Sequence, residues 1–251
     1  MPGTPLNEQD ECTISTAMVL AAGLGTRMQP LTATMPKPMI PVAGKPLLDY
    51  MLDELENGGV ARIVVNVHYL ADQIEVHLAA RQTPSIAFSD EREELLETGG
   101  GLKKARHLLG EKPFISTNTD AILTGPSGAG VRMLKSHWRD TMQGLLLLVP
   151  LANTTGFDGK GDFHLYEDGT IQHAMGGPAD YAFTGVQILS PDLLDDMPSG
   201  PFSTRKLWEK ASASNSLYGL VYPHHWLHVG TPEGVDVANQ LLKTPSFRRE
   251  R

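Results

Sequence analysis

The chain has 251 residues, of which 41% are hydrophobic and 20% are charged, with a formal net charge of −8. This composition is typical of a globular protein and excludes a disordered or fibrous one. The longest apolar run, around residues 145–149, is much shorter than the roughly 18 to 20 residues that cross a membrane, so we expect no membrane protein. The acidic balance disfavours nucleic acid as a partner. With one cysteine, Cys12, the chain can form no internal disulfide, which favours a cytoplasmic location.

Residues 1–16 lack both an apolar core and basic flanks, and we predict a flexible tail there. From residue 17 the sequence alternates short apolar runs with amphipathic segments. The pattern predicts strands at 17–22, 63–67, 86–89, 114–117 and 145–149, and helices at 47–55, 71–80, 101–109 and 131–138. This alternation predicts an α/β fold, a Rossmann-like doubly wound sheet that is mainly parallel.

The texture of the sequence changes after residue 151, where short strands and glycine-rich turns predict a small β-rich part extending roughly over 151–229. Within and after it we expect a helix at 204–213 and strands at 217–222 and 226–229. A last helix is predicted after Val229, with Thr231 as its cap and Pro232 at its first position.

The first predicted strand leads directly into the glycine-containing loop Gly23-Leu24-Gly25-Thr26-Arg27. Ligands of open α/β sheets bind at this end of the strands. Glycines let the backbone approach an anion, and Arg27 adds a planar donor group. Met28 stands where a dinucleotide fingerprint needs its third glycine, so the loop predicts a different phosphate site. A simple glycine turn is the alternative.

A lysine framed by prolines follows, in Pro36-Lys37-Pro38. The two prolines predict a stiff, largely extended backbone, which would hold the ammonium group in place. A compact point charge of this kind suits a phosphate oxygen. Alone, the motif could be a solvated lysine in a proline-rich loop, but together with the glycine loop it favours an anion site.

These motifs resemble the signature of the sugar-1-phosphate nucleotidyltransferases, which join a nucleoside triphosphate and a sugar 1-phosphate into a nucleotide sugar and release pyrophosphate. The resemblance rests on LAAGLGTRMQPLT and PKPMIPVAGKP, and on LETGGG at 96–101, NTD at 118–120, GDF at 161–163, FTGV at 183–186 and VGT at 229–231. LETGGG, GDF and the short length look most like enzymes that use UTP and N-acetylmuramate 1-phosphate in peptidoglycan recycling. Mannose- or heptose-1-phosphate guanylyltransferases, or a non-catalytic nucleotide-sugar-binding regulator, are the alternatives.

The resemblance implies that residues 17–251 form a nucleotidyltransferase domain whose sugar-binding part lies at roughly 151–229. Arg27, Lys37 and Asp120 would be catalytic. The implied nucleotide-binding residues are Leu20, Ala21, Ala22, Gly23, Gly25, Thr26, Arg27, Lys37, Thr98, Gly99, Gly100 and Asn118. In this set Thr98, Gly99 and Gly100 would lie against the base, where missing side chains leave room for the ring, although a glycine-rich helix start is the alternative.

On the sugar side the resemblance implies Asp162 and Gly185. Many relatives also carry a lysine that clamps the sugar phosphate, but this chain has no lysine between Lys160 and Lys206. Lys160 is a candidate replacement. Turn roles for Lys160, Asp162 and Gly185 are the alternative. We expect a monomer or a small homo-oligomer.

A metal site is implied at Asp120, the position where the family binds Mg²⁺, an ion that prefers carboxylate, phosphate and water oxygens. The second ligand position, just before VGT, holds His228. Imidazole is a poor ligand for Mg²⁺ but is accepted by Mn²⁺. His228 could therefore bind a softer ion, contact phosphate or simply pack. A zinc site with the neighbouring histidines is disfavoured because adjacent residues of a strand point to opposite faces.

Overall fold

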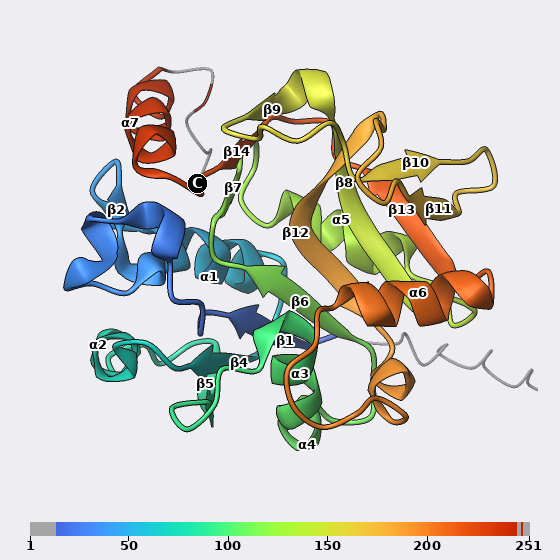
Figure 1. The fold of residues 1–251 in the computed structure, drawn as a ribbon, viewed down its shortest axis with the longest axis horizontal. Coiled ribbons are helices and arrows are strands. Elements are labelled where there is room, and N and C mark those ends of the chain that lie inside the picture. The colour runs from blue at the N-terminus through green and yellow to red at the C-terminus, as the bar shows by residue number, and fades with distance from the viewer. Residues whose placement is uncertain (1–13, 245–246, 248–251) are drawn as a thin grey trace, which may run out of the picture.

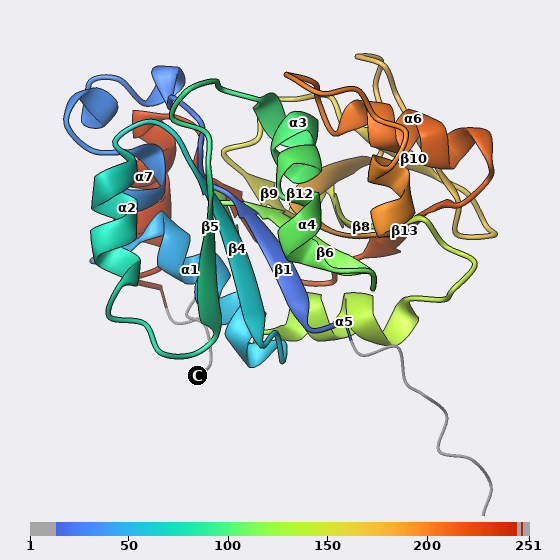
Figure 2. The same ribbon diagram turned by 90° about the horizontal axis from the view of Figure 1, so that it is seen from below.

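The computed structural model describes residues 14–244 and residue 247. A nine-stranded mixed sheet runs through the molecule (Figure 1), in the order β11-β10-β12-β6-β1-β4-β5, with β8 beside β12 and β13 beside β8. Helices cover both faces of this sheet (Figure 2), which confirms the predicted doubly wound α/β architecture. None of the described helices is long and apolar enough to cross a membrane.

The parallel half of the sheet is built around β1 (Thr16–Leu20), which pairs in parallel with β4 (Arg62–Val67) and β6 (Phe114–Asn118). On the far side of β4 lies β5 (Ser85–Asp90), again parallel. Because parallel strands end at the same edge, the segments that follow β1, β4 and β6 emerge side by side. This edge is where the fold places a ligand site.

Alternating side chains of β1 and β4 pack under helices on opposite faces. Val19 and Val65 belong to a core with α1 (Leu47–Asn57), α2 (Ala71–Leu78) and α5 (Ala129–His137). Met18 and Val64 face the other way. They pack with α3 (Glu97–Lys104), α4 (Arg106–Leu109) and α6 (Arg205–Ala213). The helix predicted at 101–109 is therefore two helices, and it starts earlier than expected.

The second half of the chain extends the same sheet, mostly with antiparallel pairs. Here β12 (Tyr181–Leu189) lies antiparallel to both β6 and β8 (Gly144–Pro150). The other strands of this half are β10 (Phe163–Leu165), β11 (Ile171–His173) and β13 (Leu217–Val221). The predicted β-rich part is thus joined to the main sheet.

A small three-stranded sheet stands beside the main one, in the order β7-β14-β9. Its strands are β7 (Ala121–Leu123), β9 (Thr154–Thr155) and β14 (Trp226–His228), of which β7 was not predicted. The last helix, α7 (Pro232–Leu241), begins as predicted, because the Thr231 hydroxyl accepts a hydrogen bond from the Gly234 N–H at 3.2 Å. The remaining short elements are η1 (Thr26–Met28), η2 (Leu31–Ala33), η3 (Lys37–Met39), β2 (Pro41–Val42), β3 (Lys45–Pro46), η4 (Leu151–Asn153) and η5 (Pro191–Leu194).

The boundary of the predicted tail needs correction. Residues 1–13, with Cys12, lie outside the described residues, whereas 14–16 belong to the folded domain. Ile14 is buried in the core, and the Ser15 carbonyl accepts hydrogen bonds from the backbone N–H groups of Ala61 and Arg62. The domain therefore includes Ile14, because one apolar side chain and the edge of β1 anchor these three residues.

Candidate active site

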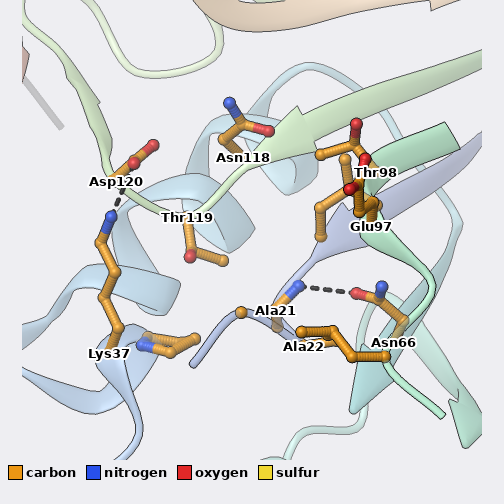
Figure 3. A pocket seen from close by; sticks show the side chains of 13 residues that line it. Ala21, Ala22, Lys37, Asn66, Glu97, Thr98, Asn118, Thr119 and Asp120 are labelled. Carbon is orange, nitrogen blue, oxygen red and sulfur yellow. Dashed lines mark hydrogen bonds and ion pairs between the residues drawn. The ribbon is translucent and has the colours of Figure 1, made fainter. Parts of the chain in front are cut away.

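A cavity of about 260 Å³ opens at the carboxyl ends of β1 and β6 (Figure 3). It is lined by the end of β1 with its following loop, the segment around Lys37, the end of β4, the start of α3 and the residues after β6. The lining residues are Leu20, Ala21, Ala22, Gly23, Lys37, Pro38, Asn66, Leu95, Glu97, Thr98, Asn118, Thr119 and Asp120. The structure thus brings Leu20, Ala21, Ala22, Gly23, Lys37, Thr98, Asn118 and Asp120 of the sequence-predicted set to one cavity.

The two glycines of the loop have different roles. A Cβ atom at Gly23 would meet nothing within 4 Å, so the backbone there is open to a ligand in the cavity. Gly25 instead shapes the turn, with φ of +64° and the Thr32 hydroxyl donating to its carbonyl at 2.9 Å. Gly25, Thr26 and Arg27 lie beyond the lining residues. Arg27 is exposed and forms no ion pair with any described residue.

Lys37 enters the cavity from a short 3₁₀ turn, η3, which the Met39 N–H closes on the Pro36 carbonyl at 2.8 Å. The extended backbone predicted for this motif is therefore wrong at Lys37. Pro36 itself is extended. The prediction fails because a proline ring fixes only φ, near −65°, and this φ is compatible with a 3₁₀ turn, such as the one that contains Pro38, as well as with an extended backbone. The Lys37 ammonium donates to Oδ2 of Asp120 at 2.7 Å, and its side chain is only 15% exposed.

The second neighbour of the Asp120 carboxylate is His228, the last residue of β14. His228 Nε2 lies 3.5 Å from Asp120 Oδ2, and the Val229 N–H donates to the Asp120 carbonyl at 2.8 Å. Burial raises the pKa of Asp120, but the charge of Lys37 and the hydrogen bond from His228 outweigh it and hold the pKa below its ordinary value. The carboxylate is therefore ionised at neutral pH.

The other ring nitrogen of His228, Nδ1, lies 3.2 Å from the Gly156 carbonyl. In the contact with Asp120, Nε2 is the donor. With a cation between the two side chains, the proton would move to Nδ1, where the Gly156 carbonyl can accept it, and the Nε2 lone pair would face the ion. Among the described residues no group of three or more His, Cys, Asp or Glu side chains gathers for a metal ion. A divalent ion held by Asp120 and His228 would thus take its other ligands from phosphate and water, as Mg²⁺ commonly does.

The start of α3 departs from the sequence-based expectation. A Cβ atom at Gly99 would lie 2.4 Å from the Phe202 ring, and one at Gly100 would lie 2.4 Å from the Gly200 carbonyl oxygen. The N–H groups of both glycines donate to the Phe202 carbonyl. Protein fills the space beside Gly99 and Gly100, and neither glycine lines the cavity, which favours the alternative of a glycine-rich helix start. Their contact with a base stays a prediction. The glycines allow α3 to pack closely on the segment before α6.

Thr98 and Glu97 do line the cavity at this helix start. The Thr98 hydroxyl accepts a hydrogen bond from the Thr204 N–H at 2.9 Å, which ties α3 to the start of α6. Glu97 is exposed and has φ of +58°, a backbone conformation that residues other than glycine rarely adopt. Glu97 lies at the wall of the cavity.

On the sugar side, an irregularity in β12 between Phe183 and Gln187 brings Gly185 beside the cavity. Gly185 has φ of +87°, and a Cβ atom there would lie 3.1 Å from the amide nitrogen of Asn118. Asp162 is held by the same strand, since its Oδ2 accepts the Phe183 N–H at 2.8 Å. The exposed Lys160 accepts a hydrogen bond from Ala179 through its carbonyl. Of the predicted sugar residues, Gly185 thus borders the cavity through Asn118, whereas Asp162 is linked to it only through Phe183 of the same strand.

The sequence did not predict three of the residues that line the cavity, Asn66, Leu95 and Thr119. Asn66 is nearly buried, and its Oδ1 accepts the Ala21 N–H at 2.7 Å. The signal for it was a lone amide in the otherwise apolar end of β4, RIVVNV, at the edge where ligands bind.

Comparison with known proteins places these observations in a family. Residues 16–243 match the family model described as nucleotidyl transferase. The chain is 44% identical over 232 residues to the N-acetylmuramate alpha-1-phosphate uridylyltransferase of Caulobacter vibrioides, covering 90% of this chain and 96% of that protein. It is 29% identical over 227 residues to mannose-1-phosphate guanyltransferase beta-A of Xenopus laevis, covering 86% of this chain and 61% of that protein.

Among solved structures, the crystal structure of UDP-glucose pyrophosphorylase complexed with UDP-glucose superposes with a TM-score of 0.73. The sequence identity is 18%, and the match covers 90% of this chain and 97% of the other. This similarity therefore concerns the fold.

Proposed function

The chain belongs to the nucleotidyl transferase family, and from this premise we propose that it transfers the uridylyl group of UTP to N-acetylmuramate 1-phosphate in peptidoglycan recycling. It is a nucleotidyltransferase, an enzyme that joins a nucleoside triphosphate and a sugar 1-phosphate into a nucleotide sugar. The 44% identity to a uridylyltransferase supports the choice of base and sugar. It also disfavours the alternative of a non-catalytic regulator. A cytoplasmic location and a monomer or small homo-oligomer stay predictions.

The reaction needs no nucleophilic side chain. A phosphate oxygen of the sugar 1-phosphate attacks the α-phosphorus of the triphosphate and forms the new P–O bond. The bond from the α-phosphorus to the bridging oxygen breaks, and pyrophosphate leaves with that electron pair. Because the attacking phosphate is already anionic at neutral pH, the protein contributes positioning and charge stabilisation.

The observation that carries the proposal is the meeting of open backbone at Gly23, the Lys37 ammonium and the Asp120 carboxylate in one cavity. We assign the triphosphate to the loop from Gly23 through Gly25 and Thr26 to Arg27. Arg27 forms no ion pair within the described part of the chain, so its guanidinium is available to phosphate. Lys37 would neutralise charge that develops on the α-phosphate.

The remaining roles follow from position. Asp120 and His228 would hold a divalent ion, Mg²⁺ or Mn²⁺, which when bound neutralises phosphate charge. Leu20, Ala21, Ala22 and Thr98 would surround the nucleoside. Asn118 would lie between nucleotide and sugar, since it lines the cavity and touches Gly185. Asp162 and Gly185 would border the sugar.

The test is release of pyrophosphate by the purified protein with each of the four common nucleoside triphosphates and a panel of sugar 1-phosphates. We expect release to require both substrates and to be fastest with UTP and N-acetylmuramate 1-phosphate. Faster release with GTP and mannose or heptose 1-phosphate would favour the guanylyltransferase alternative. No release with any pair would contradict the proposal.

A further inference from the structure

A fully buried carboxylate, Glu91, lies behind the cavity in the loop between β5 and α3. Its two oxygens accept hydrogen bonds from different parts of the cavity wall. Oε1 accepts from the side-chain amide of Asn66 at 2.8 Å, and Oε2 accepts from the Leu96 N–H at 3.3 Å. Asn66 in turn accepts the Ala21 N–H at 2.7 Å (Figure 3). One chain of hydrogen bonds therefore connects Ala21, Asn66, Glu91 and Leu96.

The ends of this chain are the two sides of the candidate nucleotide site. Ala21 follows β1 and leads to the open backbone at Gly23. Leu96 directly precedes Glu97 and Thr98, which line the side formed by α3. Because both backbone N–H groups are held through Asn66 and Glu91, the separation of the two sides is set by side chains that do not depend on a ligand.

Gly101, the third glycine of LETGGG, supports a specific role for this pair. A Cβ atom at Gly101 would lie 2.8 Å from Glu91 Oε1 and 2.9 Å from the amide nitrogen of Asn66. Real Cβ atoms essentially never approach so closely. The glycine therefore leaves room for the Glu91–Asn66 hydrogen bond, and this accounts for a motif residue that lies outside the cavity lining.

We propose that Glu91 is a positioning residue that holds the loop after β1 and the start of α3 at the separation that a nucleotide requires. The proposal rests on the nucleotide site assigned under the proposed function. A preformed site binds more tightly because less ordering is needed on binding. Glu91 acts through Asn66 and Leu96 and need not touch the nucleotide.

Position 91 needs a carboxylate because both side-chain oxygens of Glu91 accept a hydrogen bond. In Glu91→Gln, the amide group must point one donor at either Asn66 or Leu96, which are donors themselves. Turning the Asn66 amide around only moves the conflict to the Ala21 N–H. In Asn66→Asp the introduced carboxylate faces that of Glu91. Each single variant thus breaks the chain of hydrogen bonds without changing the size of a side chain.

The double variant Glu91→Gln/Asn66→Asp restores a consistent set. The carboxylate introduced at position 66 accepts from the Ala21 N–H and from the amide introduced at position 91. The oxygen of that amide still accepts from Leu96. Glu93→Gln is the matched control, because Glu93 is an exposed glutamate of the same loop.

We expect Glu91→Gln to raise the KM for UTP about tenfold and to change kcat by less than about threefold, since a broken buried hydrogen bond to a charged group has an effect of that order. In the double variant the KM for UTP should return most of the way to the wild-type value, and Glu93→Gln should keep that value. Without any nucleotide, hydrogen exchange at the Ala21 and Leu96 amides should accelerate in Glu91→Gln and slow again in the double variant.

Three results would overturn the proposal: a wild-type KM in Glu91→Gln, whatever its thermal stability; no recovery in the double variant; or a changed preference among the four bases, which would place Glu91 in contact with the base. The proposed function fails separately, if the wild type releases no pyrophosphate with any substrate pair. In that case UTP affinity by calorimetry and the exchange rates still decide the role of Glu91.

Discussion

Oδ2 of Asp120 is the atom on which the charged groups of the cavity converge. It accepts from Lys37 at 2.7 Å and faces His228 Nε2 at 3.5 Å. Lys37 keeps the carboxylate ionised, and the carboxylate keeps the ammonium at the cavity wall. Two residues far apart in the sequence thus fix one another where phosphate charge is expected.

Lys37→Ala should remove turnover and leave the fold intact. We expect kcat/KM to fall at least about 100-fold, because Lys37 faces developing charge in a partly buried site. The free energy of unfolding should change by no more than about 1 to 2 kcal/mol, since the Lys37–Asp120 pair keeps some exposure. Pyrophosphate release and urea unfolding measure the two effects.

Lys45→Ala is the matched control for this experiment, because Lys45 forms an ion pair with Asp53 away from the cavity. It should keep wild-type turnover. A loss of stability in Lys37→Ala as large as its loss of activity would show that the lysine serves folding instead.

His228 permits a test of ligand softness. If its imidazole reaches the ion, Mn²⁺ should support turnover at a lower concentration than Mg²⁺, and His228→Asp should shift the preference toward Mg²⁺. Asp120→Asn should raise the metal concentration required at least about tenfold, because it removes the one carboxylate assigned to the ion. Pyrophosphate release against metal concentration measures all three proteins.

Two outcomes of the metal titrations would contradict these assignments. Identical preferences for Mg²⁺ and Mn²⁺ before and after His228→Asp would eliminate imidazole ligation. An unaffected Asp120→Asn variant would contradict the whole metal site.

At the scale of elements, the alternation of apolar and amphipathic segments predicted the main strands and helices but not where α3 starts. Glycine has a low helix propensity, so the sequence favoured a start at the end of LETGGG, at Gly101. The structure starts α3 at Glu97, because Phe202 and Gly200 pack against Gly99 and Gly100. These contacts join segments about 100 residues apart, and local propensity carries no information about them.

The helix α5 depends on a residue of another helix. Glu54 of α1 is fully buried, and its carboxylate accepts the N–H groups of Gly128 at 2.8 Å and Gly130 at 2.9 Å. These groups lie at the N-terminus of α5, where helices have N–H groups without internal partners and favour negative charge. Glu54 therefore links α1 and α5 on one face of the sheet.

Glu54→Ala should lower the free energy of unfolding by about 2 to 3 kcal/mol, because it leaves buried N–H groups without an acceptor. Glu54→Gln should lower it by less, since one oxygen remains. Neither variant should change the KM for UTP, as Glu54 lies outside the cavity lining. Urea unfolding with steady-state kinetics is the measurement, and an altered KM at unchanged stability would contradict this role.

At the scale of the whole molecule, the site is assembled from three parts of the fold. The parallel half of the main sheet supplies Gly23 and Asp120, the antiparallel half supplies Gly185, and the small sheet supplies His228. The periodicity of the sequence could not predict that these residues meet. Their meeting depends on the pairing of β14 with β7 and of β12 with β6, and these strands are far apart in the sequence. Resemblance to a family indicated these residues, and the sheet topology explains why they meet.

The outer end of the antiparallel half holds a histidine that stabilises the molecule in its neutral form. His173 of β11 packs edge-on against Phe163, with ring centroids 5.2 Å apart, and lies over Trp208 of α6. Its Nδ1 accepts the Met175 N–H at 2.9 Å, so a proton on Nδ1 would break this bond. Burial lowers the pKa of His173 from its ordinary value of 6.5, and Arg205 lowers it further, while Asp162 and Glu209 act in the opposite direction.

This arrangement predicts how stability depends on pH. Below about pH 6.5 the unfolded chain takes up a proton at His173 before the folded chain does, so the free energy of unfolding should fall as the pH drops from 7.5 to 5. His225 contributes to the same pH dependence, because burial lowers its pKa as well. The contribution of His173 is therefore obtained by comparing the wild type with a variant that lacks this histidine. His173→Asn keeps an acceptor for the Met175 N–H but does not titrate, so its stability should fall less steeply with acidification. Urea unfolding of both proteins at several pH values gives the comparison, and equal slopes would mean that His173 is protonated without cost to the fold.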